Sequence, residues 1–268
     1  MYESLATRLL NPLATGGSVD VFAVIGTGDA PPKQQWGWDF ASVNPQESDV
    51  WAALSAIQPR VVERPRRPAL ARNAQCPLDE TFEGSMIAQI SQWQTCMAAI
   101  ERAEAEDAQQ APAAARYQWI VRARPDMYWY DAHNALCGSS PKIVQHKFPS
   151  ELYYTEGGEF DDQYFVLPRA HADSVMAGMA RKYAACTDHN LVAGAAYVPV
   201  RYLEQWLKLE MDDVSQRADV PVEQYNAPFT LVRRDSQQPS AGIWCERGAP
   251  DRRACMRGAY PEEAWRWP

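Results

Sequence analysis

The sequence predicts an α/β fold, with helices flanking a mostly parallel sheet. Short apolar runs typical of buried strands alternate with segments of helical periodicity through the first half of the 268 residues. The composition, 46% hydrophobic and 22% charged, is that of an ordinary globular chain and suffices for one large core. We therefore expect a single domain over residues 1–234, followed by an irregular cap rich in Arg, Pro and Gly at 235–268.

The first elements follow from local patterns. The run VDVFAVI at 19–25 predicts a buried strand. Turn residues, beginning with Gly26, end this strand. A short helix is expected over 46–57. The apolar RVVE at 60–63 predicts a second strand, closed by the Pro-Arg-Arg-Pro stretch at 65–68.

Residues 84–107 have apolar side chains at helical spacing and a charged end, which predicts a long amphipathic helix. The segment YQWIVRARPDMYW at 117–129 begins as a strand, and Pro125 ends its regular pattern.

Further elements are expected in the second half of the chain. These are strands at 142–146, 163–167 and 229–233, and helices at 169–184 and 199–213.

Charge and hydropathy exclude some classes of protein. The net charge of −8 and the pI near 5.1 argue against a nucleic-acid binder, which needs a basic face for phosphate. No apolar run approaches 18 residues, so no transmembrane segment is predicted. The first 13 residues lack the features of a signal peptide. We expect a Golgi or secretory-lumen location if an N-terminal anchor is missing from this sequence, and a cytoplasmic one otherwise.

The six cysteines show no CxxC spacing, which argues against a zinc site. An even number fits an oxidising lumen, although six cysteines allow 15 pairings. Cys245 and Cys255 flank a loop rich in Gly, Pro and Arg, and we predict a disulfide between them. Cys96 lies within the long helical pattern and is expected to be a free core thiol.

Arg122, Arg124 and Asp126 form the first candidate site. The strand at 117–124 delivers them to its carboxyl end. Guanidinium groups bind phosphate through paired donors, and a carboxylate can ligate a divalent cation such as Mn²⁺ or Mg²⁺ held by a diphosphate. The alternative is an Arg–Asp pair that braces the turn after the strand.

A second candidate site is the acidic segment GGEFDDQ, in which Glu159, Asp161 and Asp162 lie within four positions after two glycines. Clustered carboxylates repel one another, which suits Asp161 or Asp162 to act as a general base toward a hydroxyl group. The alternative is an acidic surface turn. Because ligands of open α/β sheets bind at strand ends, we predict that this segment and Asp126 share one cleft.

The four histidines lack the spacing of a metal motif. We interpret each of them as a surface or capping residue, with His189 as an alternative third metal ligand. The segment Gly16-Gly17-Ser18 is not followed by a P-loop pattern, which argues against the alternative of a sulfo- or phosphotransferase.

These segments, in their order along the chain, resemble a group of GT-A-type glycosyltransferases that includes lipopolysaccharide-synthesis enzymes and algal relatives. In that group a strand of type YDWVVRxRPDL precedes a DDQFxVxxR segment, and here YQWIVRARPDMYW precedes GGEFDDQYFVLPR. The acidic stretch also resembles the GGEDDD segment of galactosyltransferases, where an Asp is the catalytic base. The resemblance covers roughly residues 10–235 and implies a GT-A-like, Rossmann-like fold.

By the same resemblance, Asp126 takes the place of the carboxylate that meets the metal and diphosphate. Asp161 or Asp162 takes the place of the acceptor base, and Arg169 the place of the Arg after the strand. One departure is that Arg124 stands where the first Asp of an Asp-x-Asp motif would be. Because a cationic side chain replaces a metal ligand there, this departure argues against a strict requirement for a metal ion in this protein.

The predicted function is therefore transfer of a sugar from a nucleotide-diphosphate sugar to the hydroxyl of a glycan acceptor. Asp161 and Asp162 are the catalytic candidates; Arg122, Arg124 and Asp126 are the donor-binding ones, with Asp126 as the metal ligand. The alternative is a catalytically degenerate carbohydrate-binding or scaffold domain, which the missing Asp-x-Asp motif favours.

Overall fold

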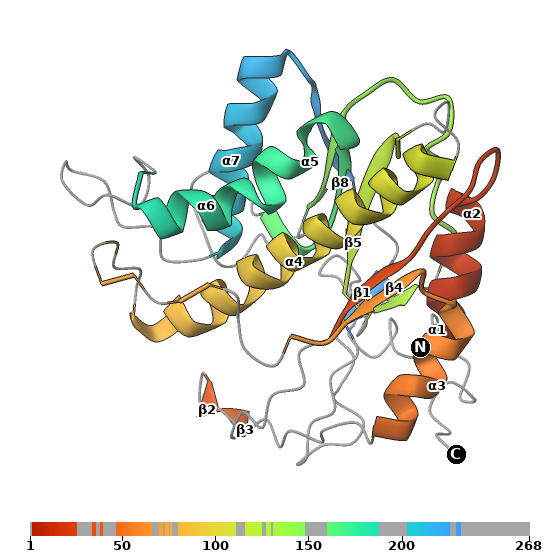
Figure 1. Cartoon of the computed structure of the whole chain (residues 1–268), viewed down its shortest axis with the longest axis horizontal. Helices are drawn as coiled ribbons and strands as arrows, with labels where there is room; N and C mark the ends of the chain where they lie inside the picture. Colours follow the sequence, from red (N-terminus) through yellow and green to blue (C-terminus); the bar gives the residue numbers. More distant parts are fainter. Residues whose placement is uncertain are drawn as a thin grey trace, which may run out of the picture.

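A computed structural model describes most of the chain up to residue 231 (Figure 1). The described residues are 2–25, 34–35, 38–39, 47–65, 70–71, 73–74, 76, 80–110, 116–124, 127–129, 131–147, 160–187, 203–225 and 229–231.

The described elements alternate between helix and strand, which confirms a mixed α/β protein. The helices are α1 (Tyr2–Ser4), the π-helix η1 (Leu5–Leu10), α2 (Asn11–Leu13), α3 (Glu47–Ile57), α4 (Glu80–Gln110), α5 (Arg169–Met176), α6 (Gly178–Ala185) and α7 (Leu203–Ala218). The strands are β1 (Phe22–Val24), β2 (Gln34–Gln35), β3 (Trp38–Asp39), β4 (Val61–Glu63), β5 (Trp119–Ala123), β6 (Met127–Trp129), β7 (Ile143–Lys147), β8 (Phe160–Pro168), β9 (Val222–Tyr225) and β10 (Phe229–Leu231).

The largest sheet has the strand order β5-β8-β7-β9. Strand β8 is antiparallel to both of its neighbours, whereas β7 and β9 are parallel. Consequently β5, β7 and β9 run in one direction and β8 runs against them. The expectation of a mostly parallel sheet is corrected here to a mixed one, because hydrophobic runs reveal that a strand is buried but not which way it runs.

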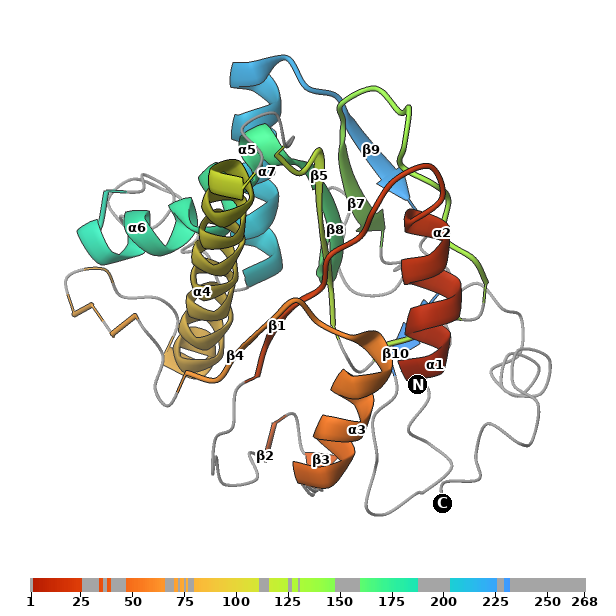
Figure 2. The same cartoon turned by 45° about the vertical axis from the view of Figure 1, so that its right-hand side comes forward.

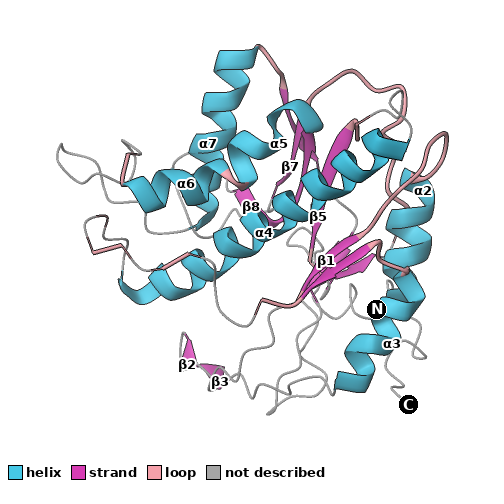
Figure 3. Ribbon diagram, in the orientation of Figure 1, coloured by secondary structure: helices cyan, strands magenta, loops and turns pink. Residues whose placement is uncertain are grey.

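Three smaller strand pairs accompany this sheet. Strands β1 and β4 pair in parallel, while β6–β10 and β2–β3 are antiparallel. Figure 3 shows β2 and β3 apart from the main sheet. The guanidinium of Arg60 ties the β1–β4 pair to α4 and to the segment before β5. It bonds Asp20 at 2.9 Å, Asp107 at 2.6 Å and the Tyr117 hydroxyl at 3.1 Å.

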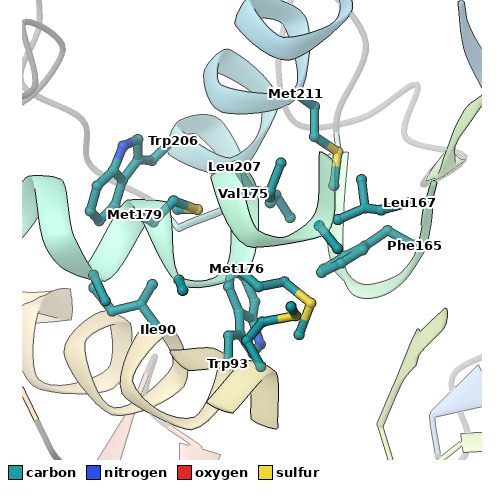
Figure 4. Packing of buried hydrophobic residues seen from close by; sticks show 14 of the residues in the cluster. Ile90, Trp93, Phe165, Leu167, Val175, Met176, Met179, Trp206, Leu207 and Met211 are labelled. Carbon is teal, nitrogen blue, oxygen red and sulfur yellow. The ribbon is translucent and has the colours of Figure 1, made fainter. Parts of the chain in front are cut away.

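Helices α4, α5 and α7 cover one face of the main sheet, and α6 packs against α4 and α5. Together they form the larger core (Figure 4). Phe165 and Leu167 of β8 project into it, and the Trp93 ring of α4 meets the Phe165 ring edge-on at 5.6 Å. Met176 of α5 and Trp206 of α7 fill the space between the helices. Because successive side chains of a strand point to opposite faces, Phe165 and Leu167 share this face, and the residues between them face the other way.

The other face of the sheet packs against the N-terminal helical segment, as Figure 2 shows. Tyr164 and Val166 of β8 lie in this second core with Leu9, Leu13 and Trp129. The second half of β8 is therefore buried on both faces, which explains the apolar run from Tyr164 to Leu167.

The helical periodicity predicted α3 closely and the position of α4, although α4 is longer than expected. Several features differ from the sequence expectation, among them the short strands β2, β3 and β6 and the bounds of α7. Strand β8 begins at Phe160, inside the expected polar loop, and the helix over 169–184 is divided into α5 and α6 at Ala177. The N-terminal helices and β9 were not expected, because each is too short to show a clear period.

Candidate functional site

The carboxyl ends of β5, β7 and β9 lie at one edge of the main sheet, beside the amino end of β8. The register shows this, since Ala123 pairs with Tyr164, Lys147 with Phe160 and His146 with Tyr225. Open α/β sheets bind ligands beyond the carboxyl ends of their strands, so this edge is the candidate site. The carboxyl end of β5 and the amino end of β8 meet there because β8 runs antiparallel to β5.

Asp162 is the acidic residue that the structure describes best at this edge. It is the third residue of β8, and it is only 4% exposed. It is two residues before Tyr164 and so faces the N-terminal helices. Within the described residues its carboxylate has no hydrogen bond or ion pair, although a buried carboxylate ordinarily needs one.

Arg122 faces the opposite side of the sheet. It pairs with Phe165 in the register, and cross-strand neighbours share a face. Its guanidinium carbon lies 5.7 Å from the centre of the Trp93 ring of α4, a cation–π geometry. Arg122 and Asp162 therefore do not share one face, although both belong to strands that reach the same edge.

Arg124 follows the last residue of β5 and is half-buried at the edge itself. Its backbone N–H donates to the Met127 sulfur at 3.3 Å, which closes the turn into β6. Of the two predicted arginines, Arg124 is the one placed next to the amino end of β8.

Several predicted residues lie outside the described part of the chain. These are Asp126, Glu159, the side chain of Asp161, His189 and the Cys245–Cys255 pair. The predicted shared cleft of Asp126 and Asp162, the disulfide and the cap at 235–268 therefore stay predictions. Cys96 has a free thiol, and burial raises the pKa of Cys96 to about 11.

Arg169, the arginine that follows the strand in the resembling group, is the first residue of α5. Its guanidinium forms a two-pronged ion pair with Glu104 of α4, at 2.9 and 2.6 Å. The two side chains are 13% and 9% exposed. The contacts of Arg169 therefore join two helices of the larger core.

A buried histidine beside the edge was missed by sequence reasoning, which placed it on the surface or at a cap. His133 is 5% exposed, and its backbone N–H donates to the Arg8 carbonyl at 2.7 Å. Its Nδ1–H donates to the Asn134 carbonyl, which leaves Nε2 to accept from the Tyr164 hydroxyl. The Tyr225 ring lies 5.4 Å from the imidazole. No local motif marks His133, because its partners come from β8 and from the unexpected strand β9.

Burial keeps the side chains of His133, Tyr164 and Tyr225 neutral. It lowers the pKa of His133, an effect that the hydrogen bond to Asn134 partly offsets. Burial also raises the pKa of Tyr164 well above its ordinary value, and raises that of Tyr225. The neutral imidazole and the two neutral phenols form a polar cluster under the edge, on the same face as Asp162.

We expect His133 to make the protein less stable in acid. Its folded pKa lies below the ordinary 6.5, so the unfolded chain takes up the proton first, and the free energy of unfolding falls as the pH drops below about 6.5. Urea unfolding at about pH 7.5 and about pH 5.5 measures this slope. His133→Gln should reduce the slope, whereas the matched control His171→Gln should keep it. Equal slopes in the three proteins would contradict the assignment.

In the described part of the chain, no three His, Cys, Asp or Glu side chains are grouped so that they could hold a metal ion. None of the described helices is long and apolar enough to cross a membrane.

Comparison of the chain with protein-family models, with curated proteins and with solved structures found no match.

Proposed function

We propose that this protein is a glycosyltransferase that moves a sugar from a nucleotide-diphosphate sugar to the hydroxyl of a glycan acceptor. The observation that supports this most is the position of Asp162, which is buried at the amino end of β8 and has no partner among the described residues. Arg124 follows the carboxyl end of β5 at the same edge of the sheet. A carboxylate and a phosphate-binding cation are the groups that this transfer needs.

In the proposed reaction, Asp162 or Asp161 accepts the proton of the acceptor hydroxyl as its oxygen attacks the anomeric carbon. The nucleoside diphosphate leaves, and the guanidinium of Arg124 stabilises its developing charge. Arg122 contributes indirectly, because its stacking on Trp93 anchors the strand that ends in Arg124.

We propose Asp126 as the ligand of a divalent cation, Mn²⁺ or Mg²⁺, which would supply charge stabilisation to the diphosphate. Among the described residues no three His, Cys, Asp or Glu side chains are grouped for such an ion, so the proposed site depends on Asp126 and Asp161, whose side chains lie outside the described part. A GT-A-like fold is part of the same proposal. It is supported by a sheet between two helical layers, with three carboxyl ends at one edge (Figure 2).

Thermal unfolding in the presence of UDP- and GDP-sugars, with and without Mn²⁺, tests the proposal. A nucleotide sugar at about 100 times its dissociation constant should raise the free energy of unfolding by roughly 2.7 kcal/mol. Arg124→Gln should abolish the gain. If no nucleotide sugar stabilises the protein, the proposal fails.

The second candidate is a degenerate domain of the same fold that binds carbohydrate without transferring it. Arg122 favours this candidate, because its guanidinium lies over Trp93 on the face opposite to Asp162. Titration with glycans separates the two functions. Glycan binding by a protein that ignores nucleotide sugars would support the degenerate domain.

A further inference from the structure

A cavity lies among helices α5, α6 and α7, with a volume of about 340 Å³. This volume is at the lower end of the range for small-molecule sites. The cavity is lined by helices that have ends at the edge of the sheet opposite to the candidate site. Helix α5 starts at the carboxyl end of β8, and α7 ends just before β9 begins, so both helix ends lie at the edge opposite to Arg124 and Asp162.

The cavity is lined by cations. Arg181 and Lys182 of α6 and Arg217 of α7 contribute three positive charges, and Ser174 and Thr187 contribute hydroxyl groups. Among the described residues that line it there is no carboxylate. The lining therefore presents hydrogen-bond donors with a net positive charge, in a chain whose overall charge is −8.

The carboxylates that balance these cations lie outside the lining. Arg181 pairs with Asp173 at 2.6 Å, and Arg217 pairs with Asp213 at 2.7 Å. The two arginine side chains are 56% and 62% exposed, and ion pairs at such exposure contribute little to stability. Either guanidinium can therefore leave its aspartate for a stronger anion at small cost.

Lys182 behaves differently, because its carboxylate partner is buried. Its ammonium group lies 2.5 Å from Glu210, which is 1% exposed. Removing a cation from a buried carboxylate is costly, so this pair stays in place and anchors α6 against α7. The cavity thus has one fixed wall and two arginines that are free to reorient.

We propose that this cavity binds a small ligand with phosphate or sulfate groups. Arg181 and Arg217 would turn from Asp173 and Asp213 to the ligand, since a guanidinium donates paired hydrogen bonds to a tetrahedral oxyanion. Ser174 and Thr187 would donate to the remaining oxygens. The proposal does not depend on the function proposed for the sheet edge.

Calorimetry on the full chain tests the proposal, with inorganic pyrophosphate and glucose 6-sulfate as separate probes. A preference for one probe identifies the phosphate or the sulfate source. Arg181→Gln/Arg217→Gln should weaken binding of the preferred probe at least tenfold, about the effect of losing one charge-assisted hydrogen bond. The matched control is Arg102→Gln, since Arg102 is 58% exposed and pairs with Glu63 away from the cavity. It should change binding less than about twofold.

A second variant should shift affinity in the opposite direction. Asp173→Asn/Asp213→Asn frees both arginines, so the preferred probe should bind several times more tightly. This variant also decides the matter if the arginine variant does not fold. The proposal is overturned if neither probe binds, or if the aspartate variant leaves affinity unchanged. It is also overturned if binding survives in the arginine variant and is lost in Arg124→Gln, because the anion then occupies the sheet edge.

Discussion

Asp162→Asn should slow sugar transfer by about 100- to 10,000-fold, the usual loss when a general base is removed, while donor binding stays near normal. The amide has the shape of the carboxylate but cannot take a proton from the acceptor. Because Asp162 is buried and has no partner in the described part of the chain, the substitution breaks no described contact. The loss should therefore fall on turnover.

Initial rates with a nucleotide sugar and a glycan acceptor, together with calorimetry of the nucleotide, check this result. Asp212→Asn is the matched control, since Asp212 pairs with Lys208 on the surface of α7 at 2.5 Å. It should keep full activity. Asp161→Asn reports which of the two neighbouring aspartates is the base.

Asp126→Asn should behave differently, weakening the binding of donor or metal and slowing donor hydrolysis without acceptor. This contrast separates the donor role from the acceptor role. If Asp126, Asp161 and Asp162 can all be neutralised without a change in binding or turnover, the assignment of the edge as a catalytic site is wrong.

Arg169→Met should lower the free energy of unfolding by about 3 kcal/mol. The substitution leaves Glu104 nearly buried without its cation, and breaking a buried ion pair costs roughly 3–5 kcal/mol. We expect the low end of this range because both side chains keep slight exposure. Equilibrium unfolding in urea measures the change.

Arg102→Met provides the control for Arg169, because Arg102 also pairs with a glutamate but is 58% exposed. An exposed pair contributes about 0–1 kcal/mol, so this variant should unfold nearly like the wild type. The double variant Arg169→Met/Glu104→Leu should recover much of the loss, since an apolar pair can replace a buried ionic one. Similar small losses for Arg169→Met and Arg102→Met would show that the pair contributes little.

Local pattern alone identified the helices and strands that have strong periods. The long helix α4 and the strand β5 were recognisable because their apolar spacing reflects one buried face, whatever the rest of the chain does. The position of Arg124 at the end of β5 also followed from sequence, since an apolar strand gives way there to charged residues. Asp161 and Asp162, by contrast, lie inside β8.

The tertiary structure decided the direction of β8 and the face of each site residue. A reversed strand has the same composition, so only its pairing with β5 and β7 placed Asp162 at the edge that Arg124 reaches. The same register put Arg122 on the α4 face. His133 became a buried hydrogen-bond partner of Tyr164 through contacts between residues 31 positions apart. Such contacts depend on how distant segments pack, and local spacing contains no record of them.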